Sequence, residues 1–195
     1  MKRIGEIERK TKETQVKVKI NLDGEGKGRI STGIPFFDHM LDLLTYHSLF
    51  DLEVEAVGDI EVDFHHTVED VGITLGEALK EALGNKEGIE RYGWTLIPMD
   101  ESLALVSIDF SSRPLLVFRG EIKREKVGVF DSELLKVFLQ SFSVHAGITL
   151  HVNLLYGENS HHCFEAIFKA LGRALHIATR INKERKGVPS SKGIL

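Results

Sequence analysis

The sequence predicts an α+β fold of two similar half-domains, each a small β-sheet covered on one face by two helices. Three observations support this prediction. The chain of 195 residues is 42% hydrophobic and 28% charged, which is enough apolar material for a folded core. A His-His-x-x-Glu pattern occurs twice, at residues 65–69 and 161–165. Around each copy, strand-like alternation and helical spacing follow one another in the same order.

An internal repeat extends beyond these two motifs. The Leu-Gly-x-Ala-Leu pattern at 75–79 recurs at 171–175, at the same offset of 96 residues that separates the motifs. Further upstream, an offset of 98 matches His47 to His145. A repeat of this kind indicates two copies of one structural unit. The expected division is a first half over residues 1–90, a second half over 91–182 and a tail over 183–195.

In the first half, the pattern predicts three strands and two helices. Pro35 opens a helix over residues 35–45, because its missing N–H costs nothing at that position. Asp63 can cap a second helix over residues 65–83. Two-residue alternation and short apolar runs predict the strands. These strands lie at residues 15–22, 52–57 and 60–62.

The second half repeats this order. Helical spacing predicts one helix over residues 132–142 and another over 161–181. Asn159 or Ser160 can cap the second of these helices. Strands are expected at 103–110, 115–118 and 148–153.

Composition excludes several functional classes. The formal charge is −4, and the short basic cluster at 183–186 includes Glu184, so a nucleic-acid partner is not expected. The single Cys163 excludes an internal disulfide and a cysteine-rich zinc site. No apolar run is long enough for a membrane span, and residues 1–10 lack the apolar core of a secretory signal. We therefore expect a cytoplasmic protein with a small-molecule substrate.

The two His-His-x-x-Glu segments, here called the metal motifs, suit metal ligation. His65 and Glu69 are four residues apart and share a helix face, whereas His65 and His66 point about 100° apart. Adjacent histidines therefore serve two different ions. Imidazole with carboxylate suits a borderline metal such as Mn, Fe or Zn, and the helix N-terminus favours neutral imidazole. The alternative for a single motif is a solvent-exposed helix start, but two copies in register favour ligation.

Other histidines give weaker signals. His39 follows Asp38 inside a strongly apolar stretch, so it is either a ligand or a buried histidine with a polar partner. His47 and His145 match in the repeat, but each could simply end a helix, where a histidine is favourable. His151 has a similarly weak case, and His176 is expected at the surface.

Several segments carry a family resemblance. They are GIPFFDHML at 33–41, DFHHTVEDVGI at 63–73, ITLH at 148–151 and GENSHHCFEAIFKALGRAL at 157–175, with TKET at 11–14 and SSKG at 190–193 towards the ends. These segments resemble the imidazoleglycerol-phosphate dehydratase family. The resemblance covers essentially the whole chain, and the paired metal motifs are highly specific.

The resemblance implies a hydro-lyase of histidine biosynthesis. Its reaction removes water from D-erythro-imidazole glycerol phosphate to give imidazole acetol phosphate. It also implies a large octahedral homo-oligomer with two Mn²⁺ ions per active site and ligands from more than one subunit. The implied ligands are His39, His65, His66, Glu69, His161, His162 and Glu165.

One position departs from the family pattern. At the offset of 98, the repeat counterpart of His39 is Val137, where many family members carry His or an acid. Valine cannot ligate a metal, so the second ion would have one protein ligand fewer. Either water fills this position or His145 reaches it.

The proposed chemistry needs metals, a base and cations. Metals on both imidazole nitrogens would hold the ring as an imidazolate that can expel the neighbouring hydroxyl. A general base must then remove a proton from carbon. By resemblance this base is Glu13, which also contacts the substrate. The phosphate would be bound by Arg91, Arg113, Lys169, Ser191 and Lys192, with the tail ordered by phosphate.

Two other functions remain open from the residues alone. A two-metal phosphatase or other hydrolase would use the same ligands but would release phosphate or amine. A non-enzymatic metal-binding scaffold would explain the metal motifs but not the cations at Arg91, Arg113 and Lys192. Incubation with the substrate distinguishes the three functions.

Overall fold

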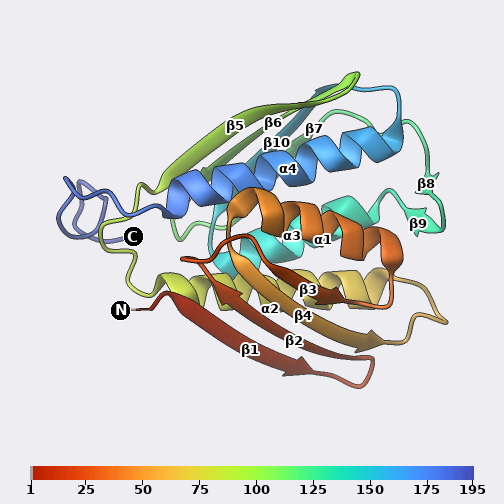
Figure 1. Ribbon diagram of the computed structural model, residues 1–195, viewed down its shortest axis with the longest axis horizontal. Helices are drawn as coiled ribbons and strands as arrows, with labels where there is room; N and C mark the ends of the chain where they lie inside the picture. Colours follow the sequence, from red (N-terminus) through yellow and green to blue (C-terminus); the bar gives the residue numbers. More distant parts are fainter. Residues whose placement is uncertain (1) are drawn as a thin grey trace.

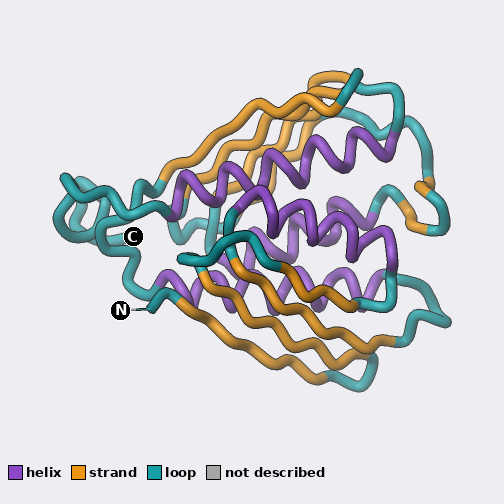
Figure 2. Tube along the Cα trace, in the orientation of Figure 1, coloured by secondary structure: helices purple, strands orange, loops and turns teal. Residues whose placement is uncertain are grey.

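The structure is a computed structural model that describes residues 2–195. Within this range, two four-stranded sheets enclose four helices (Figures 1 and 2). None of the described helices is long and apolar enough to cross a membrane. The helices are α1 (Pro35–Ser48), α2 (His65–Leu83), α3 (Leu134–Ala146) and α4 (Ser160–Thr179).

The two sheets have the same topology. The first has the order β1-β2-β4-β3, and the second has the order β5-β6-β10-β7. In each sheet the first three strands are antiparallel and the last strand is parallel to its neighbour. The first sheet contains β1 (Ile4–Lys10), β2 (Thr14–Asn21), β3 (Gly28–Ser31) and β4 (Asp51–Gly58). The second contains β5 (Tyr92–Met99), β6 (Ser102–Asp109), β7 (Leu115–Arg119) and β10 (Thr149–Tyr156), and β8 (Lys126–Val127) pairs with β9 (Phe130–Asp131) in a separate hairpin.

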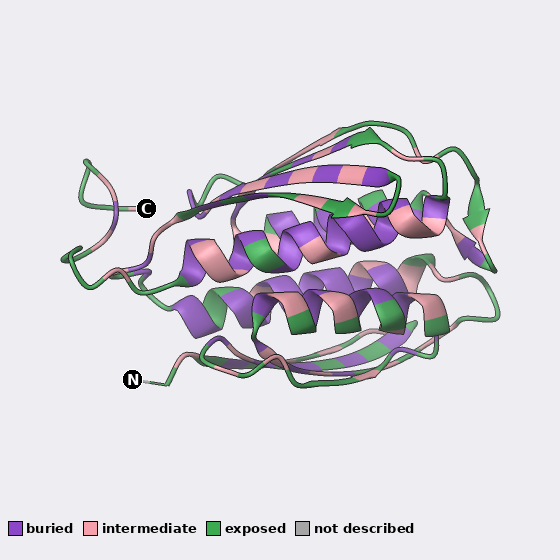
Figure 3. Cartoon of the chain, turned by 45° about the horizontal axis from the view of Figure 1, so that its top comes forward, coloured by how far each residue is buried: buried purple, intermediate pink, exposed green. Residues whose placement is uncertain are grey.

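The core lies between the sheets. In β2, alternate residues such as Val16 and Val18 are fully buried towards the helices, because successive strand side chains point to opposite faces. The helices bury their apolar faces in the same layer, as Figure 3 shows by residue burial. Helix α1 packs on α4, and α2 packs on α3. The first sheet lies on α2 and the second on α4.

Two glycines show how closely each sheet approaches its helix. A Cβ atom on Gly5 in β1 would lie 2.0 Å from the carbonyl oxygen of Ala78 in α2. A Cβ atom on Gly93 in β5 would lie 2.0 Å from the carbonyl oxygen of Ala174 in α4. Both positions therefore require glycine. The two halves repeat even this detail of packing.

The predicted fold class is confirmed, whereas some predicted elements are wrong. Residues 60–62 form a turn and not a strand, and α3 begins and ends later than the predicted range of 132–142. Sequence patterns also missed β1, β3 and β5. Each of these strands lies next to one other strand of its sheet, and its exposed side breaks the apolar pattern on which the prediction depends.

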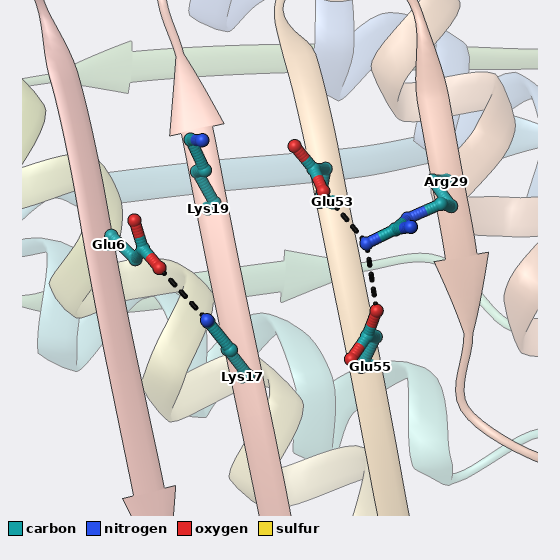
Figure 4. A pocket seen from close by; sticks show the side chains of 6 residues that line it. All are labelled: Glu6, Lys17, Lys19, Arg29, Glu53 and Glu55. Carbon is teal, nitrogen blue, oxygen red and sulfur yellow. Dashed lines mark hydrogen bonds and ion pairs between the residues drawn. The ribbon is translucent and has the colours of Figure 1, made fainter.

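The outer faces of the two sheets differ in charge. On the first sheet, charged side chains line a shallow hollow and pair across strands, with Lys17 3.0 Å from Glu6 and Arg29 bound to Glu53 and Glu55 (Figure 4). The second sheet instead exposes large apolar side chains. These include Tyr92, Trp94, Leu96, Leu115 and Leu155.

Candidate metal centre

A cluster of three side chains that could ligate a metal forms where α1 meets α4. His39 Nε2 lies 3.2 Å from Glu165 Oε1, and His161 Nε2 lies 3.0 Å from the same oxygen. His161 and Glu165 share one face of α4 because they are four residues apart. His39 comes from the second turn of α1, which packs on α4. The three ligand atoms lie within 4.8 Å of one another, as ligands of one ion do.

The Glu165 carboxylate is held ionised in this cluster. Burial opposes the charged form and raises its pKa, but the Lys169 ammonium, His39 and His161 outweigh burial and lower the pKa to about 2. The Lys169 Nζ atom lies 2.7 Å from Glu165 Oε2. An ionised carboxylate beside two imidazoles provides the negative charge and the lone pairs that a dication requires.

His162, the second histidine of this motif, points to a different carboxylate. Its Nδ1 atom donates to Glu101 Oε2 at 2.7 Å. Glu101 also accepts the backbone N–H groups of Glu158 and Asn159 with its other oxygen. These contacts lower the pKa of Glu101, and the hydrogen bond to Glu101 raises the pKa of His162. As expected from the sequence, Asn159 caps α4 by accepting the N–H of His161.

The first metal motif forms no such cluster within the chain. His65 is exposed and Glu69 is half-buried, and among residues 2–195 the three-ligand group is found only at α4. The structure gives a reason, because Val137 on α3 stands at the repeat position of His39. His145 does not replace it. Its Nδ1 bonds Glu77, two helical turns beyond Glu69.

His66 and Glu13 lie together beside the first motif. His66 Nδ1 donates to Asp59 at 3.0 Å, and this hydrogen bond raises the pKa of His66. Glu13 lies in the turn between β1 and β2, one residue before the β2 strand, and is exposed. Its Oε2 atom is 3.9 Å from His66 Nδ1. The structure therefore brings Glu13 next to a predicted metal ligand that is 53 residues away in sequence.

The predicted phosphate-binding residues separate into two groups. Lys169 lies near the α4 cluster, 3.0 Å from the sulfur of Met99 at the end of β5. Arg91 precedes the start of β5, where it binds Asp109 and the carbonyl oxygen of Pro189. Eight strand residues separate these places, a distance of roughly 25 Å. Arg113, Ser191 and Lys192 are exposed, and Arg113 Nη2 lies 3.9 Å from the same Asp109.

Sequence reasoning missed Asp59, Glu101 and Asp109. A signal for Glu101 was available in the repeat. Glu13 and Glu101 each directly precede the second strand of their sheet, so they are counterparts at an offset of 88 residues. Asp59 and Asp109 had no such signal, because acids at strand ends are common without a function.

The donor set fits a metal ion. Two imidazoles and one ionised carboxylate converge at the N-terminal ends of helices, and oxygen and nitrogen ligands of this kind suit borderline first-row dications. The second motif therefore holds a group that could bind a metal. Such a donor set on a duplicated α+β scaffold is typical of a metal-dependent enzyme.

Comparison with known proteins identifies the family. A model of the imidazoleglycerol-phosphate dehydratase family matches residues 32–175. Relatives named imidazoleglycerol-phosphate dehydratase include one from Pelobacter propionicus, 54% identical over the full length of both chains. Another is from Clostridium novyi, 58% identical over 96% of this chain and 95% of that protein. The chain belongs to the imidazoleglycerol-phosphate dehydratase family.

Two solved structures of imidazoleglycerol-phosphate dehydratases share this fold. The imidazoleglycerol-phosphate dehydratase of Staphylococcus aureus superposes with a TM-score of 0.84 at 42% identity, covering 92% of this chain and 99% of that one. The Pyrococcus furiosus structure, in complex with (S)-C348, superposes with a TM-score of 0.84 at 40% identity, covering 97% of this chain and all of that one.

Proposed function

We propose that the chain is a hydro-lyase that converts imidazole glycerol phosphate to imidazole acetol phosphate in histidine biosynthesis. Family membership over the whole chain supports this function. The observation that carries it is the His39, His161 and Glu165 cluster, because it supplies metal ligands at one of the two metal motifs.

We further propose two Mn²⁺ ions per active site. Bound Mn²⁺ would act as a Lewis acid that orients the imidazole ring and the hydroxyl groups of the substrate. The α4 cluster provides three ligands for one ion. His65 and Glu69 would provide ligands for the other. His66 and His162 point away from the first histidine of their own motif, so each would bind an ion other than the one that its neighbouring histidine binds.

The chain's own residues would perform the proton transfer. Glu13 is exposed in a short turn, so a substrate can reach its carboxylate. Its backbone N–H donates to Thr11 Oγ1 at 3.1 Å and its carbonyl accepts the N–H of Asp59 at 3.1 Å, so the turn is held in place. Glu13 would take the carbon-bound proton as general base.

The phosphate would be bound by cations that lie at the two ends of β5. Arg91 and Arg113 would contribute N–H donors that suit phosphate oxygens, and Lys169 a point charge. Ser191 and Lys192 would contribute donors from the tail at 183–195, which follows the two proposed halves at 1–90 and 91–182. Arg91 already bonds the carbonyl oxygen of Pro189, so it connects the start of β5 to this tail.

A complete site would need more than one copy of the chain. Arg91 and the α4 cluster lie at opposite ends of β5, too far apart to contact one small substrate. The first motif also lacks a third ligand within the chain. The exposed apolar face of the second sheet, with Trp94 and Leu96, offers area for association. We propose a large octahedral homo-oligomer, and sizing with and without a chelator tests whether metal supports it.

The function is tested by incubating the protein with imidazole glycerol phosphate and Mn²⁺. We expect the ketone product to form without free phosphate, and activity to disappear with a chelator. Release of inorganic phosphate would instead identify a two-metal phosphatase. Metal binding with no turnover would identify a scaffold.

A further inference from the structure

One contact recurs at both metal motifs. In each motif, the Nδ1 atom of the second histidine meets a carboxylate. His66 Nδ1 lies 3.0 and 3.2 Å from the two oxygens of Asp59, and His162 Nδ1 lies 2.7 Å from Glu101. A neutral imidazole with Nδ1–H bound to a carboxylate keeps a lone pair on Nε2. The Nε2 atom is therefore the one available to a metal.

The two carboxylates come from different places in the repeat. Asp59 directly follows β4, whereas Glu101 lies in the turn between β5 and β6. The repeat counterpart of Glu101 is Glu13, which stays 3.9 Å from His66. Duplication alone would have paired Glu13 with His66 as it pairs Glu101 with His162. The same contact is thus made by two unrelated positions, so it is not a passive result of the repeat.

We propose that Asp59 and Glu101 are positioning residues that orient His66 and His162 as metal ligands through Nε2. This inference rests on the proposed metal-binding function. Carboxylates in this position fix the tautomer and the ring orientation of a ligating histidine and make it a better donor. Asp59 has a second consequence. Because the Asp59 carboxylate already accepts from His66 Nδ1, Glu13 makes no hydrogen bond to this ring.

The Glu101 carboxylate and the Asp59 backbone are themselves held in place. Glu101 Oε1 accepts the backbone N–H groups of Glu158 and Asn159 at 3.2 and 2.7 Å, which leaves Oε2 for His162. The backbone N–H of Asp59 donates to the backbone carbonyl oxygen of Glu13 at 3.1 Å. Rigid partners of this kind limit the motion of the histidine rings, because each ring would lose a charge-assisted hydrogen bond on rotating away.

The test measures Mn²⁺ binding by the full-length chain stripped of metal, with free Mn²⁺ read from its electron paramagnetic resonance signal. The main variant is Glu101→Gln. Its amide oxygen keeps the two backbone N–H groups, so its amide nitrogen must face His162 and donate to Nδ1. That reverses the tautomer and places the proton on Nε2. We expect Mn²⁺ affinity at one class of sites to fall roughly 10–100-fold.

The second variant is Asp59→Ala, which removes the acceptor for His66 and should weaken another class of sites by a similar factor. Asp63→Asn and Glu158→Gln are matched controls. Each removes a negative charge near one motif, but neither carboxylate bonds a histidine ring. The controls should bind Mn²⁺ as the parent does. Equal losses in the controls would show that net charge and not orientation sets the affinity, and would overturn the proposal.

A double-mutant cycle separates orientation from folding. In a His162→Ala background, adding Glu101→Gln should change Mn²⁺ affinity no further, because the ring it orients is absent. A further loss of similar size would overturn the proposal by assigning Glu101 to the stability of the fold. Unchanged Mn²⁺ affinity in Glu101→Gln and Asp59→Ala would also overturn it. Failure of the parent to bind Mn²⁺ would reject both this inference and the metal-dependent function, whereas missing turnover with normal binding would reject only the lyase.

Discussion

The two halves of the molecule place the same metal motif at the N-terminal end of equivalent helices, α2 and α4, but the residues around the two motifs differ. In the second half, His161 and Glu165 meet His39 within hydrogen-bonding distance. In the first half, His65 and Glu69 belong to no group of three possible ligands among the described residues. A duplicated motif is therefore not a duplicated site. The local sequence sets where the ligands point, and the neighbouring helix decides whether a cluster forms.

The difference lies at one position of the packed helix. His39 on α1 and Val137 on α3 occupy equivalent places in the repeat, but a valine offers no lone pair. The two turns that precede β2 and β6 differ in a similar way. Glu101 is bound to His162, and its counterpart Glu13 remains exposed beside His66. The two halves thus differ both at the helix position beside the motif and at the glutamate that precedes the second strand.

The largest expected effect concerns Glu13, the glutamate of this pair that remains exposed. Glu13→Gln keeps the shape of the side chain but cannot accept a proton, so turnover should fall about 10²–10⁴-fold. Metal content should stay normal, because Glu13 is not proposed as a ligand. The measurement is turnover together with Mn²⁺ content. Near-normal turnover in a metal-replete variant would reject the general-base assignment and leave Glu13 as an exposed residue without a catalytic role.

The second prediction compares the two motif carboxylates. Glu165→Gln should lower Mn²⁺ affinity by more than the roughly 10–100-fold loss expected for removing a ligand's hydrogen-bond partner, because a charged ligand itself is lost. Glu69→Gln should lower the affinity of a different class of sites. The measurement is Mn²⁺ stoichiometry and affinity for each variant. Full occupancy in both variants would reject their assignment as ligands.

The third prediction repairs the difference between the halves. Val137→His places an imidazole where His39 stands in the repeat, so it should complete a three-ligand group with His65 and Glu69. We expect Mn²⁺ at the first motif to bind about 10-fold more tightly, a gain of about 1.4 kcal/mol. Val137→Leu is the control for packing at this half-buried position. If the histidine and leucine variants bind Mn²⁺ alike, the two halves differ for another reason.

The sequence predicted the fold class, the four helices and both metal motifs because each has a local pattern. Helical spacing and the Asn159 cap depend on residues close together in the chain. The α4 cluster was implied only through family resemblance, since His39 and Glu165 are 126 residues apart and meet through helix packing. Asp59 was not predicted, because its role depends on where a strand ends relative to the next helix. Side-chain pairing across the molecule is a tertiary property that no local pattern records.

The smallest expected effect also compares the halves, at the first residue of β4 and of β10. Asp51 accepts the N–H groups of Glu25 and Lys27, and these backbone hydrogen bonds, with the first of them dominant, lower its pKa. Its counterpart Thr149 instead donates its hydroxyl to the carbonyl oxygen of Arg113. A carboxyl whose pKa is lower in the folded state stabilises the fold above its unfolded pKa and loses that stabilisation as the pH falls.

Asp51→Asn should therefore reduce the free energy of unfolding at pH 7 by less than about 1 kcal/mol, because solvent screens the lost charge and the amide oxygen can still accept the two N–H groups. This loss should shrink as the pH falls below about 4, where the carboxyl of the unfolded chain takes up a proton first, and should vanish below the lower pKa of the folded state. Thr149→Val should lower stability by a similar amount at every pH, because the hydroxyl does not titrate in this range. Denaturant unfolding of the metal-free proteins at pH 7 and pH 3 measures the stability change of each variant. A loss for Asp51→Asn that is equal at the two pH values would show that the loop containing Glu25 and Lys27 depends on the shape of this side chain and not on its charge.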